Sequence, residues 1–213
     1  MISFVYFDLG GVVVKDLYEA DKWTDMKRDI GIKVENDKEF DQFWEKHEKE
    51  VCIAGKDVDT LIPLLEKKFH LSFPAGFSIL ADFVSRFESN KEIWPVLERI
   101  KQDCKIGLLT NMYPRMFSAI VEKGIMPPVD WDVIIDSSIE GRRKPNPDIF
   151  ELAEQKADVK KDNILFIDNK IKNINAAKDF GWQTFFYDTG DHKKSCFELL
   201  DYYNQKNSAK VFK

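Results

Sequence analysis

The chain has 213 residues, of which 44% are hydrophobic and 32% are charged, and its formal net charge is -5. This length and composition indicate one globular domain of ordinary size, with room for a small second lobe. Acidic and basic residues are interspersed and form no basic run, which argues against nucleic acid as a partner.

Further features of the sequence exclude other classes of protein. The cysteines Cys52, Cys104 and Cys196 form no CxxC pair, which predicts reduced thiols in a cytoplasmic protein rather than disulfides or a zinc site. No apolar run approaches the roughly 20 residues that cross a bilayer, so no membrane partner is expected. Neither a GxGxxG nor a Walker sequence occurs, so nucleotide binding through those loops has no support.

The first predicted element is a strand over residues 2–7. Its residues are β-branched, aromatic and apolar nearly throughout, a pattern typical of a strand that is buried on both faces of a parallel sheet. Asp8 follows this strand directly, and the pair Gly10 and Gly11 then allows the chain to turn sharply.

The segment 16–90 comes next, and it contains no convincing strand. Four helical patterns are separated by breaks at Gly31, at Gly55 and over residues 70–74. Apolar residues recur at helical spacing in these patterns, as over residues 23–30, and each set marks one buried helix face. The segment is therefore predicted to form a helical cap domain.

Strands and helices alternate in the rest of the chain. Strands are predicted over residues 105–109, 132–135, 164–167 and 184–187, and helices over residues 91–102, 114–123, 147–157, 170–180 and 196–204. This alternation is typical of an α/β fold, with a Rossmann-like parallel sheet that carries helices on both faces. Residues 1–15 and 91–213 are predicted to form this core domain, with the cap inserted after its first strand.

Polar residues follow several of the predicted strands at their carboxyl ends. They are Asp8 after the first strand, Thr110 and Asn111 after the second, and Asp168 and Asn169 after a later one. The carboxyl ends of parallel strands meet at one edge of a sheet, where ligands bind, and the loop 141–147 adds Lys144 there. Two carboxylates, a hydroxyl, an amide and a lysine together suit a hard cation and phosphoryl transfer.

These residues stand in motifs that resemble those of the haloacid dehalogenase (HAD) superfamily. Residues 7–12 (FDLGGV) are similar to its first motif, Thr110-Asn111 to the second, Lys144-Pro145 to the third and residues 166–169 (FIDN) to the fourth. The motifs come in the family order, and the insertion falls where members with a small helical (C1-type) cap carry it. The resemblance covers nearly the whole chain and extends to sugar-phosphate phosphatase-like members with glycine in the first motif.

The resemblance implies a magnesium-dependent phosphatase that hydrolyses a small soluble phosphate ester. Asp8 would attack phosphorus and form an aspartyl-phosphate, which water then hydrolyses. Thr110 and Lys144 would assist this chemistry, and both would bind the phosphoryl group together with Asn111. Lys144 would also offset the negative charges of Asp8 and the phosphate.

The implied Mg²⁺ site consists of Asp8, the carbonyl group of Gly10, Asp168 and Asn169. Family phosphatases usually carry an aspartate in place of Gly10 as general acid and base, and often a second acidic residue in place of Asn169. Glycine keeps the carbonyl ligand but has no proton to give, and a general acid contributes roughly 10²–10⁴ in rate. The two departures therefore predict slow turnover and weaker magnesium binding.

Two alternative functions remain open from the sequence. A catalytically weak family member that binds a phosphorylated ligand or a protein partner is favoured by Gly10 and Asn169. A metal-independent dehalogenase would also use an aspartate nucleophile, although the presence of Asp168 fits it less well. Taken alone, Asp168 has the plain interpretation of a helix N-cap, and Arg142 and Arg143 that of solvated surface charges.

Overall fold

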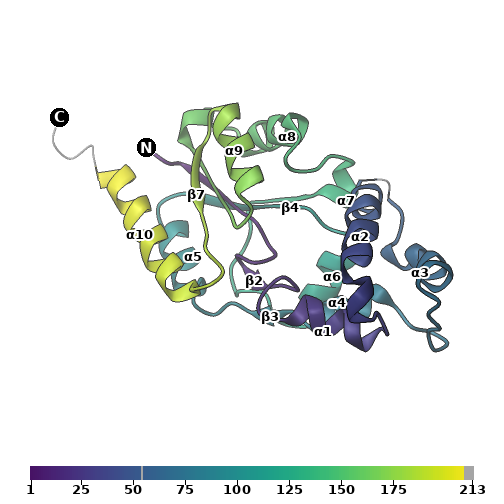
Figure 1. Ribbon diagram of the computed structural model, residues 1–213. Coiled ribbons are helices and arrows are strands. Elements are labelled where there is room, and N and C mark those ends of the chain that lie inside the picture. The colour runs from purple at the N-terminus through teal and green to yellow at the C-terminus, as the bar shows by residue number, and fades with distance from the viewer. Residues whose placement is uncertain (54, 209–213) are drawn as a thin grey trace.

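The central feature of the protein is a five-stranded parallel sheet (Figure 1). The computed structural model describes residues 1–53 and 55–208. The strands, in their order across the sheet, are β5 (Val133–Asp136), β4 (Lys105–Thr110), β1 (Phe4–Phe7), β6 (Ile164–Asp168) and β7 (Gln183–Phe186). The predicted Rossmann-like parallel sheet is thereby confirmed, with β1 at its centre.

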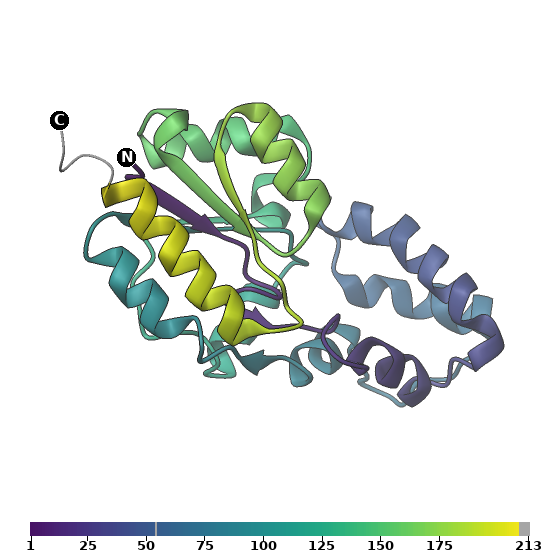
Figure 2. The ribbon, with the colours of Figure 1, turned by 60° about the vertical axis from the view of Figure 1, so that its left-hand side comes forward.

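Helices cover both faces of the sheet, as predicted (Figure 2). They are α5 (Trp94–Lys101), α6 (Met116–Glu122) and α10 (His192–Ser208) on one face, and α8 (Pro147–Ala157) and α9 (Ile171–Phe180) on the other. Successive side chains of a strand point to opposite faces, so β1 serves two cores. Val5 and Phe7 are buried in one apolar cluster, and Phe4 and Tyr6 in the other.

The predicted strands and helices of the core are all present, with shifts at their ends. The helix over 147–157 has the predicted bounds, because Pro147 favours a helix start and limits where it can begin. The predicted helix 196–204 is longer in the structure, where α10 begins at His192. Two short elements complete the core: α7 (Ser137–Glu140) after β5, and the 3₁₀ helix η3 (Lys161–Asn163) before β6.

The segment 16–90 is mostly helical, and we call it the cap; its status as a separate domain stays a prediction. It lies beyond the carboxyl edge of the sheet (Figure 2). Its elements are α1 (Lys22–Asp29), η1 (Val34–Asn36), α2 (Asp37–Val51), η2 (Val58–Leu61), α3 (Ile62–Phe69) and α4 (Ile79–Ser85). The ring of Trp44 in α2 lies 5.8 Å from that of Trp23 and 5.1 Å from that of Phe83. Such aromatic pairs each add about 0.5–1.5 kcal/mol beyond the area they bury.

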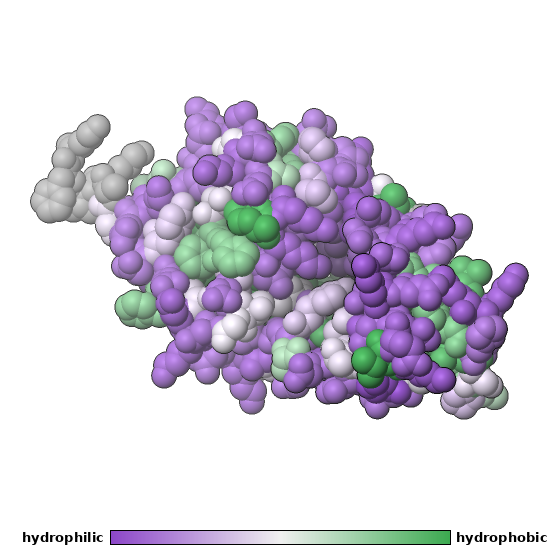
Figure 3. Space-filling model, viewed as in Figure 1, coloured by the Kyte–Doolittle hydropathy of each residue, from purple (hydrophilic) through white to green (hydrophobic). Residues whose placement is uncertain are grey.

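The face of the molecule seen in Figure 3 is largely hydrophilic, and hydrophobic side chains form small separate groups on it. None of the helices in the described part of the chain is long and apolar enough to cross a membrane. The three cysteines are free thiols, as predicted, and Cys52 and Cys196 are buried.

One expectation for the segment 16–90 is wrong, because the segment contains a short strand. Glu88 and Ser89 form β3, which pairs antiparallel with β2 (Val14–Lys15). The chain therefore enters and leaves the cap along paired strands, and the buried Asn90 donates a hydrogen bond to the Val12 carbonyl at 2.7 Å. A two-residue strand has too few positions to produce an alternating pattern in the sequence.

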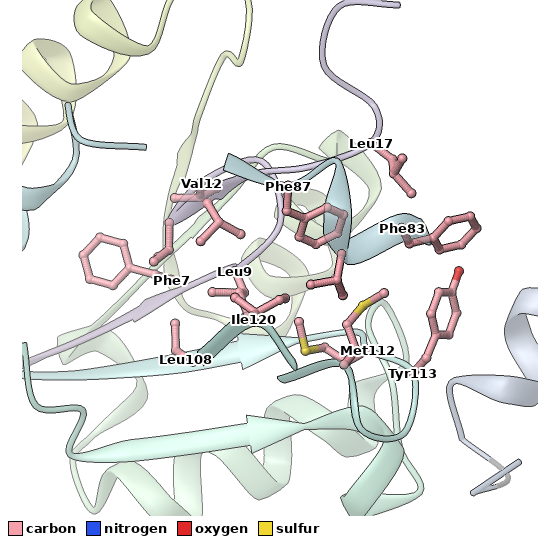
Figure 4. Packing of buried hydrophobic residues seen from close by; sticks show 14 of the residues in the cluster. Phe7, Leu9, Val12, Leu17, Phe83, Phe87, Leu108, Met112, Tyr113 and Ile120 are labelled. Atoms are coloured by element: carbon pink, nitrogen blue, oxygen red, sulfur yellow. The ribbon is translucent and has the colours of Figure 1, made fainter. Parts of the chain in front are cut away.

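The cap and the core share one continuous apolar cluster. Phe83 and Phe87 from the cap segment lie close to Met112 and Tyr113 of the core (Figure 4). The indole Nε1 of Trp44 also donates a hydrogen bond to the Tyr113 hydroxyl at 3.2 Å. This packing holds the cap against the carboxyl edge of the sheet.

Gly107 lies in β4, where neighbouring strands leave no room for a side chain. A Cβ atom there would lie 2.7 Å from Tyr6 Cε1 and 2.9 Å from the Val133 carbonyl oxygen. We expect Gly107→Ala to lower the free energy of unfolding by about 1–3 kcal/mol, because the core is already filled. Thermal unfolding measures this change.

The matched control is Gly190→Ala at an exposed position, where the nearest atom to a new Cβ is the Asp188 carboxylate at 3.2 Å. This variant should remain within about 0.5 kcal/mol of the wild type. Equal unfolding temperatures for the two variants would contradict the packing described for β4.

Candidate active site

The carboxyl edge of the sheet brings the predicted polar residues together. Asp8 directly follows β1, Thr110 and Asp168 are the last residues of β4 and β6, and Lys144 lies in the loop between α7 and α8. The predicted site residues that line one common cavity are Asp8, Gly10, Thr110, Asn111 and Lys144. Asp168 and Asn169 lie outside this lining.

Lys144 joins the two acidic residues of the site. Its ammonium group lies 3.0 Å from Asp8 Oδ1 and 2.7 Å from Asp168 Oδ2. The side chains of Lys144 and Asp168 are completely buried, and Asp8 is 7% exposed. Buried charges require partners, and the neighbouring strands β1 and β6 place both carboxylates within reach of the same lysine.

The two carboxylates share the Lys144 ammonium, and Asp168 accepts more hydrogen bonds than Asp8 does. It also accepts from Asn173 Nδ2 at 2.9 Å and from the backbone N–H of Lys170 at 2.7 Å, just before α9 begins. Asp8 accepts from the backbone N–H of the next residue at 2.8 Å. Burial raises the pKa of Asp8 to about 7, even though Lys144 lowers it. When both carboxylates are ionised, Asp8 and Asp168 carry two negative charges against the one positive charge of Lys144.

Asn111 fixes the loop that carries the lysine. Its Oδ1 accepts from the Lys144 N–H at 2.9 Å, and its Nδ2 donates to the Lys144 carbonyl at 2.9 Å. The amide thus pairs with the lysine backbone as a neighbouring strand would. Asn111 also lines the cavity, so its contact with substrate stays a prediction, and the structure adds a positioning role.

The predicted magnesium ligands suit a hard cation in charge and in donor type. The Oδ1 atom of Asn169 is buried and has no hydrogen-bond partner in the described part of the structure. Among the described residues, no three His, Cys, Asp or Glu side chains cluster as metal ligands. A cation here would therefore combine the acidic side chains with amide and carbonyl oxygens and water, as Mg²⁺ commonly does.

Several residues of the cavity carry no recognisable sequence motif. Asp16, Tyr18, Glu48 and Lys170 line it from the cap and from the start of α9. The Lys170 ammonium lies 5.0 Å above the Tyr18 ring; burial acts to lower its pKa, but nearby carboxylates, first that of Glu48, raise it. Burial also raises the pKa of Asp16. Tyr18 and Glu48 reach the cavity from the cap segment, whereas Lys170 reaches it from the core at the start of α9.

Arg143 corrects a further expectation, since the sequence predicted a solvated surface charge. The residue is 9% exposed, and its guanidinium lies 3.9 Å from the carboxylate of Glu48 in α2. Arg142 beside it is exposed, as expected. Arg143 thus connects the loop of Lys144 to the cap.

The sheet carries a buried lysine between two aspartates at its carboxyl edge, and a helical segment lies over this edge. This combination defines a class of capped Rossmann-like enzymes. A family model for haloacid dehalogenase-like hydrolases matches residues 2–181. The chain therefore belongs to the HAD-like hydrolases, and the resemblance seen in its motifs is confirmed. The subtype of the cap stays a prediction.

Solved structures of HAD enzymes share this fold. A HAD family enzyme from Bacteroides thetaiotaomicron is 17% identical with a TM-score of 0.72, over 92% of this chain and 98% of its own. A predicted HAD-like family hydrolase from Porphyromonas gingivalis is 21% identical with a TM-score of 0.71, over 94% of this chain and 98% of its own. The L-2-haloacid dehalogenase from Xanthobacter autotrophicus, with chloropropionic acid covalently bound, is 21% identical with a TM-score of 0.63, over 88% and 78%. No curated protein matches the chain in sequence.

The raised pKa of Asp8 predicts a pH-dependent stability in the absence of metal. Between the ordinary value of 3.8 and the folded value of about 7, the folded protein keeps a proton that the unfolded chain releases. Stability therefore falls as the pH rises through this range. Asp8→Asn removes the titration, so its unfolding temperature in EDTA should exceed that of the wild type by roughly 10 °C at about pH 8 and match it near about pH 4.

Magnesium gives a second measurement on the same variant. A ligand at a hundred times its Kd adds about 2.7 kcal/mol to stability. Mg²⁺ should therefore raise the unfolding temperature of the wild type by several degrees, and that of Asp8→Asn by less. Asp130→Asn, which changes an exposed carboxylate outside the cavity lining, is the control. A wild type that does not respond to Mg²⁺ would contradict the proposed metal site.

Proposed function

We propose that the protein is a magnesium-dependent phosphatase that hydrolyses a small soluble phosphate ester through an aspartyl-phosphate on Asp8. The observation that carries this proposal is the pairing of Asp8 with Lys144 at 3.0 Å, in a cavity that Thr110 also lines. A carboxylate held beside a fixed ammonium, next to a hydroxyl donor, suits attack on phosphorus and stabilisation of the charge that develops.

Each of these groups has a separate task in the proposed reaction. An oxygen of Asp8 attacks phosphorus, and Lys144 offsets the charges of the carboxylate and the phosphoryl group. The Thr110 hydroxyl donates a hydrogen bond to a phosphoryl oxygen. Asn111 keeps Lys144 in place through its two hydrogen bonds to the lysine backbone.

The cofactor in this proposal is Mg²⁺, which when bound neutralises the phosphoryl oxygens and orients them for attack. The residues that would hold it are Asp8, Asp168, Asn169 and the carbonyl group of Gly10. The excess negative charge and the unpartnered Asn169 oxygen support this assignment. The HAD family enzyme of the same fold from Bacteroides thetaiotaomicron has also been solved as a complex with magnesium and inorganic phosphate.

A dehalogenase is the second candidate, because the Xanthobacter enzyme shares the fold and holds chloropropionic acid covalently. Displacement of a halide by a carboxylate needs neither a cation nor a proton donor. A second buried carboxylate, Asp168, leaves this site with more negative charge than its one shared lysine balances. That excess favours a reaction in which a divalent cation takes part.

The dimensions of the cavity favour a small substrate. Its volume is about 70 Å³, whereas ligand pockets commonly measure roughly 300–1,000 Å³. Trp23 and Phe83 of the cap form part of its wall. A substrate much larger than a phosphate group therefore requires the cap to move away from the core. Within the cell we place the protein in the cytoplasm, where its free thiols stay reduced.

Hydrolysis of para-nitrophenyl phosphate tests the proposed function. An aryl leaving group needs little help from an acid, so Gly10 does not hide activity on it. We expect release of nitrophenol with Mg²⁺, loss of this activity with EDTA, and a decrease of roughly a thousand-fold or more in Asp8→Asn. Asp130→Asn, an identical change at an exposed position outside the cavity lining, should keep wild-type turnover.

The other outcomes distinguish the alternatives. Metal-independent release of halide from a 2-haloacid, without phosphatase activity, would replace the proposal with a dehalogenase. A folded protein that turns over neither substrate at saturating Mg²⁺ would be a family member that binds a phosphorylated ligand or a protein partner.

A further inference from the structure

Gly10 leaves space in the cavity wall, and a second carboxylate fills it. A Cβ atom built on Gly10 would lie 2.8 Å from Asp16 Oδ2, and the next nearest atoms also belong to Asp16. In an aspartate at position 10, a carboxylate oxygen would lie at a comparable distance from that Cβ. Asp16 thus brings a carboxylate oxygen to the region that a side chain of residue 10 would reach.

A tight turn brings Asp16 back to Gly10. The Gly11 N–H donates to the Val14 carbonyl at 2.8 Å, and β2 then leads from Val14 directly to Asp16. Because β2 pairs with β3, the position of Asp16 is set by strand pairing rather than by an isolated loop. The two residues are six positions apart, so no short motif links them.

The carboxylate of Asp16 is oriented toward the cavity. Asp16 is 7% exposed, and its Oδ1 accepts a hydrogen bond from the Tyr18 N–H at 2.9 Å. Its Oδ2 has no hydrogen-bond partner among the described residues, and the side chain lines the same cavity as Asp8 and Lys144. One oxygen is therefore held by the backbone, while the other is free for a reacting group.

We propose that Asp16 is the general acid and base of this enzyme, in place of the side chain that Gly10 lacks. This inference rests on the proposed phosphatase function and extends it to a substrate class. With a proton donor in the cavity, the enzyme handles alkyl phosphate monoesters, whose alkoxide leaving groups are poor unless they are protonated. The sequence predicts slow turnover because Gly10 cannot donate a proton. If Asp16 donates it instead, we expect slow turnover only in variants that lack Asp16.

The proposed steps balance in atoms and charge. In the first, an Asp8 oxygen bonds to phosphorus, the bond from phosphorus to the ester oxygen breaks, and that oxygen takes the proton of the Asp16 carboxyl group. The products are the alcohol, the aspartyl-phosphate and the Asp16 carboxylate. In the second, this carboxylate takes a proton from water, whose oxygen bonds to phosphorus as the bond to Asp8 breaks. Phosphate leaves, and both residues return to their starting states.

Steady-state and rapid-mixing kinetics with ethyl phosphate and para-nitrophenyl phosphate test Asp16→Asn. We expect kcat/KM for ethyl phosphate to fall by roughly 10²-fold or more, while kcat/KM for the aryl ester stays within about threefold. The kcat for both esters falls, because water attacks the aspartyl-phosphate without a base. The variant therefore shows a burst that approaches one nitrophenol per protein molecule.

Three controls separate catalysis from structure. Asparagine keeps the shape of Asp16 and the oxygen that Tyr18 contacts, and thermal unfolding with and without Mg²⁺ verifies the fold. Asp25→Asn removes an exposed carboxylate of α1 and should behave as wild type. The double variant Gly10→Asp with Asp16→Ala places a carboxylate at position 10. Its kcat/KM for ethyl phosphate should be at least tenfold higher than that of Asp16→Ala.

The outcomes decide between the two proposals. Unchanged kinetics of a folded Asp16→Asn, or an equal loss of kcat/KM for both esters, overturns the role of Asp16 and leaves the phosphatase standing. A wild type that does not hydrolyse para-nitrophenyl phosphate overturns the phosphatase, and the role of Asp16 with it.

Discussion

A single buried ammonium group, shared by two carboxylates, organises the carboxyl edge of this protein. Lys144 lies between Asp8 and Asp168 with no exposure to solvent, and both partners are buried. A buried ion pair is seldom a large net source of stability, because desolvation offsets the attraction. The surrounding contacts fix this group, above all the two hydrogen bonds from Asn111 to the lysine backbone. Burial raises the pKa of Asp8, and the neighbouring Asp168 raises it further. With both carboxylates ionised, their charge exceeds that of the one lysine between them and favours a bound cation.

The cap contributes to this site as directly as the sheet does. It shares an apolar cluster with the core, and its helix α2 brings Glu48 opposite Arg143 of the lysine loop. Asp16 lies where β2 leads into the cap, and the pairing of β2 with β3 holds it beside Gly10.

The sequence predicts most of the core because the responsible signals are local. The apolar runs of β1 and β6 and the helix that starts at Pro147 are visible within a few residues each. The convergence of Asp8, Thr110 and Lys144 follows from the rule that parallel strands place their carboxyl ends together. In the observed sheet, β4, β1 and β6 are neighbouring parallel strands, so the residues at their carboxyl ends do meet.

The remaining features depend on contacts between segments, and no pattern in the sequence reports them. Arg143 is buried only because α2 of the cap lies over it, and the strand Glu88–Ser89 exists only as the partner of β2. Asp16 reaches Gly10 through a turn whose geometry a motif does not encode. In each of these cases the sequence gives the residue type, but it does not give the residue or strand that the segment contacts in the fold.

In the proposed reaction, Asp8 forms a covalent bond with phosphorus. Mass spectrometry detects this bond when the protein is quenched in acid during turnover of a phosphate ester with Mg²⁺ and then digested. We expect a peptide containing Asp8 that is heavier by one phosphoryl group, that loses this group in hydroxylamine, and that is absent from Asp8→Asn. Turnover with a phosphoryl group on another residue, or turnover unaffected by Asp8→Asn, would contradict the proposed reaction.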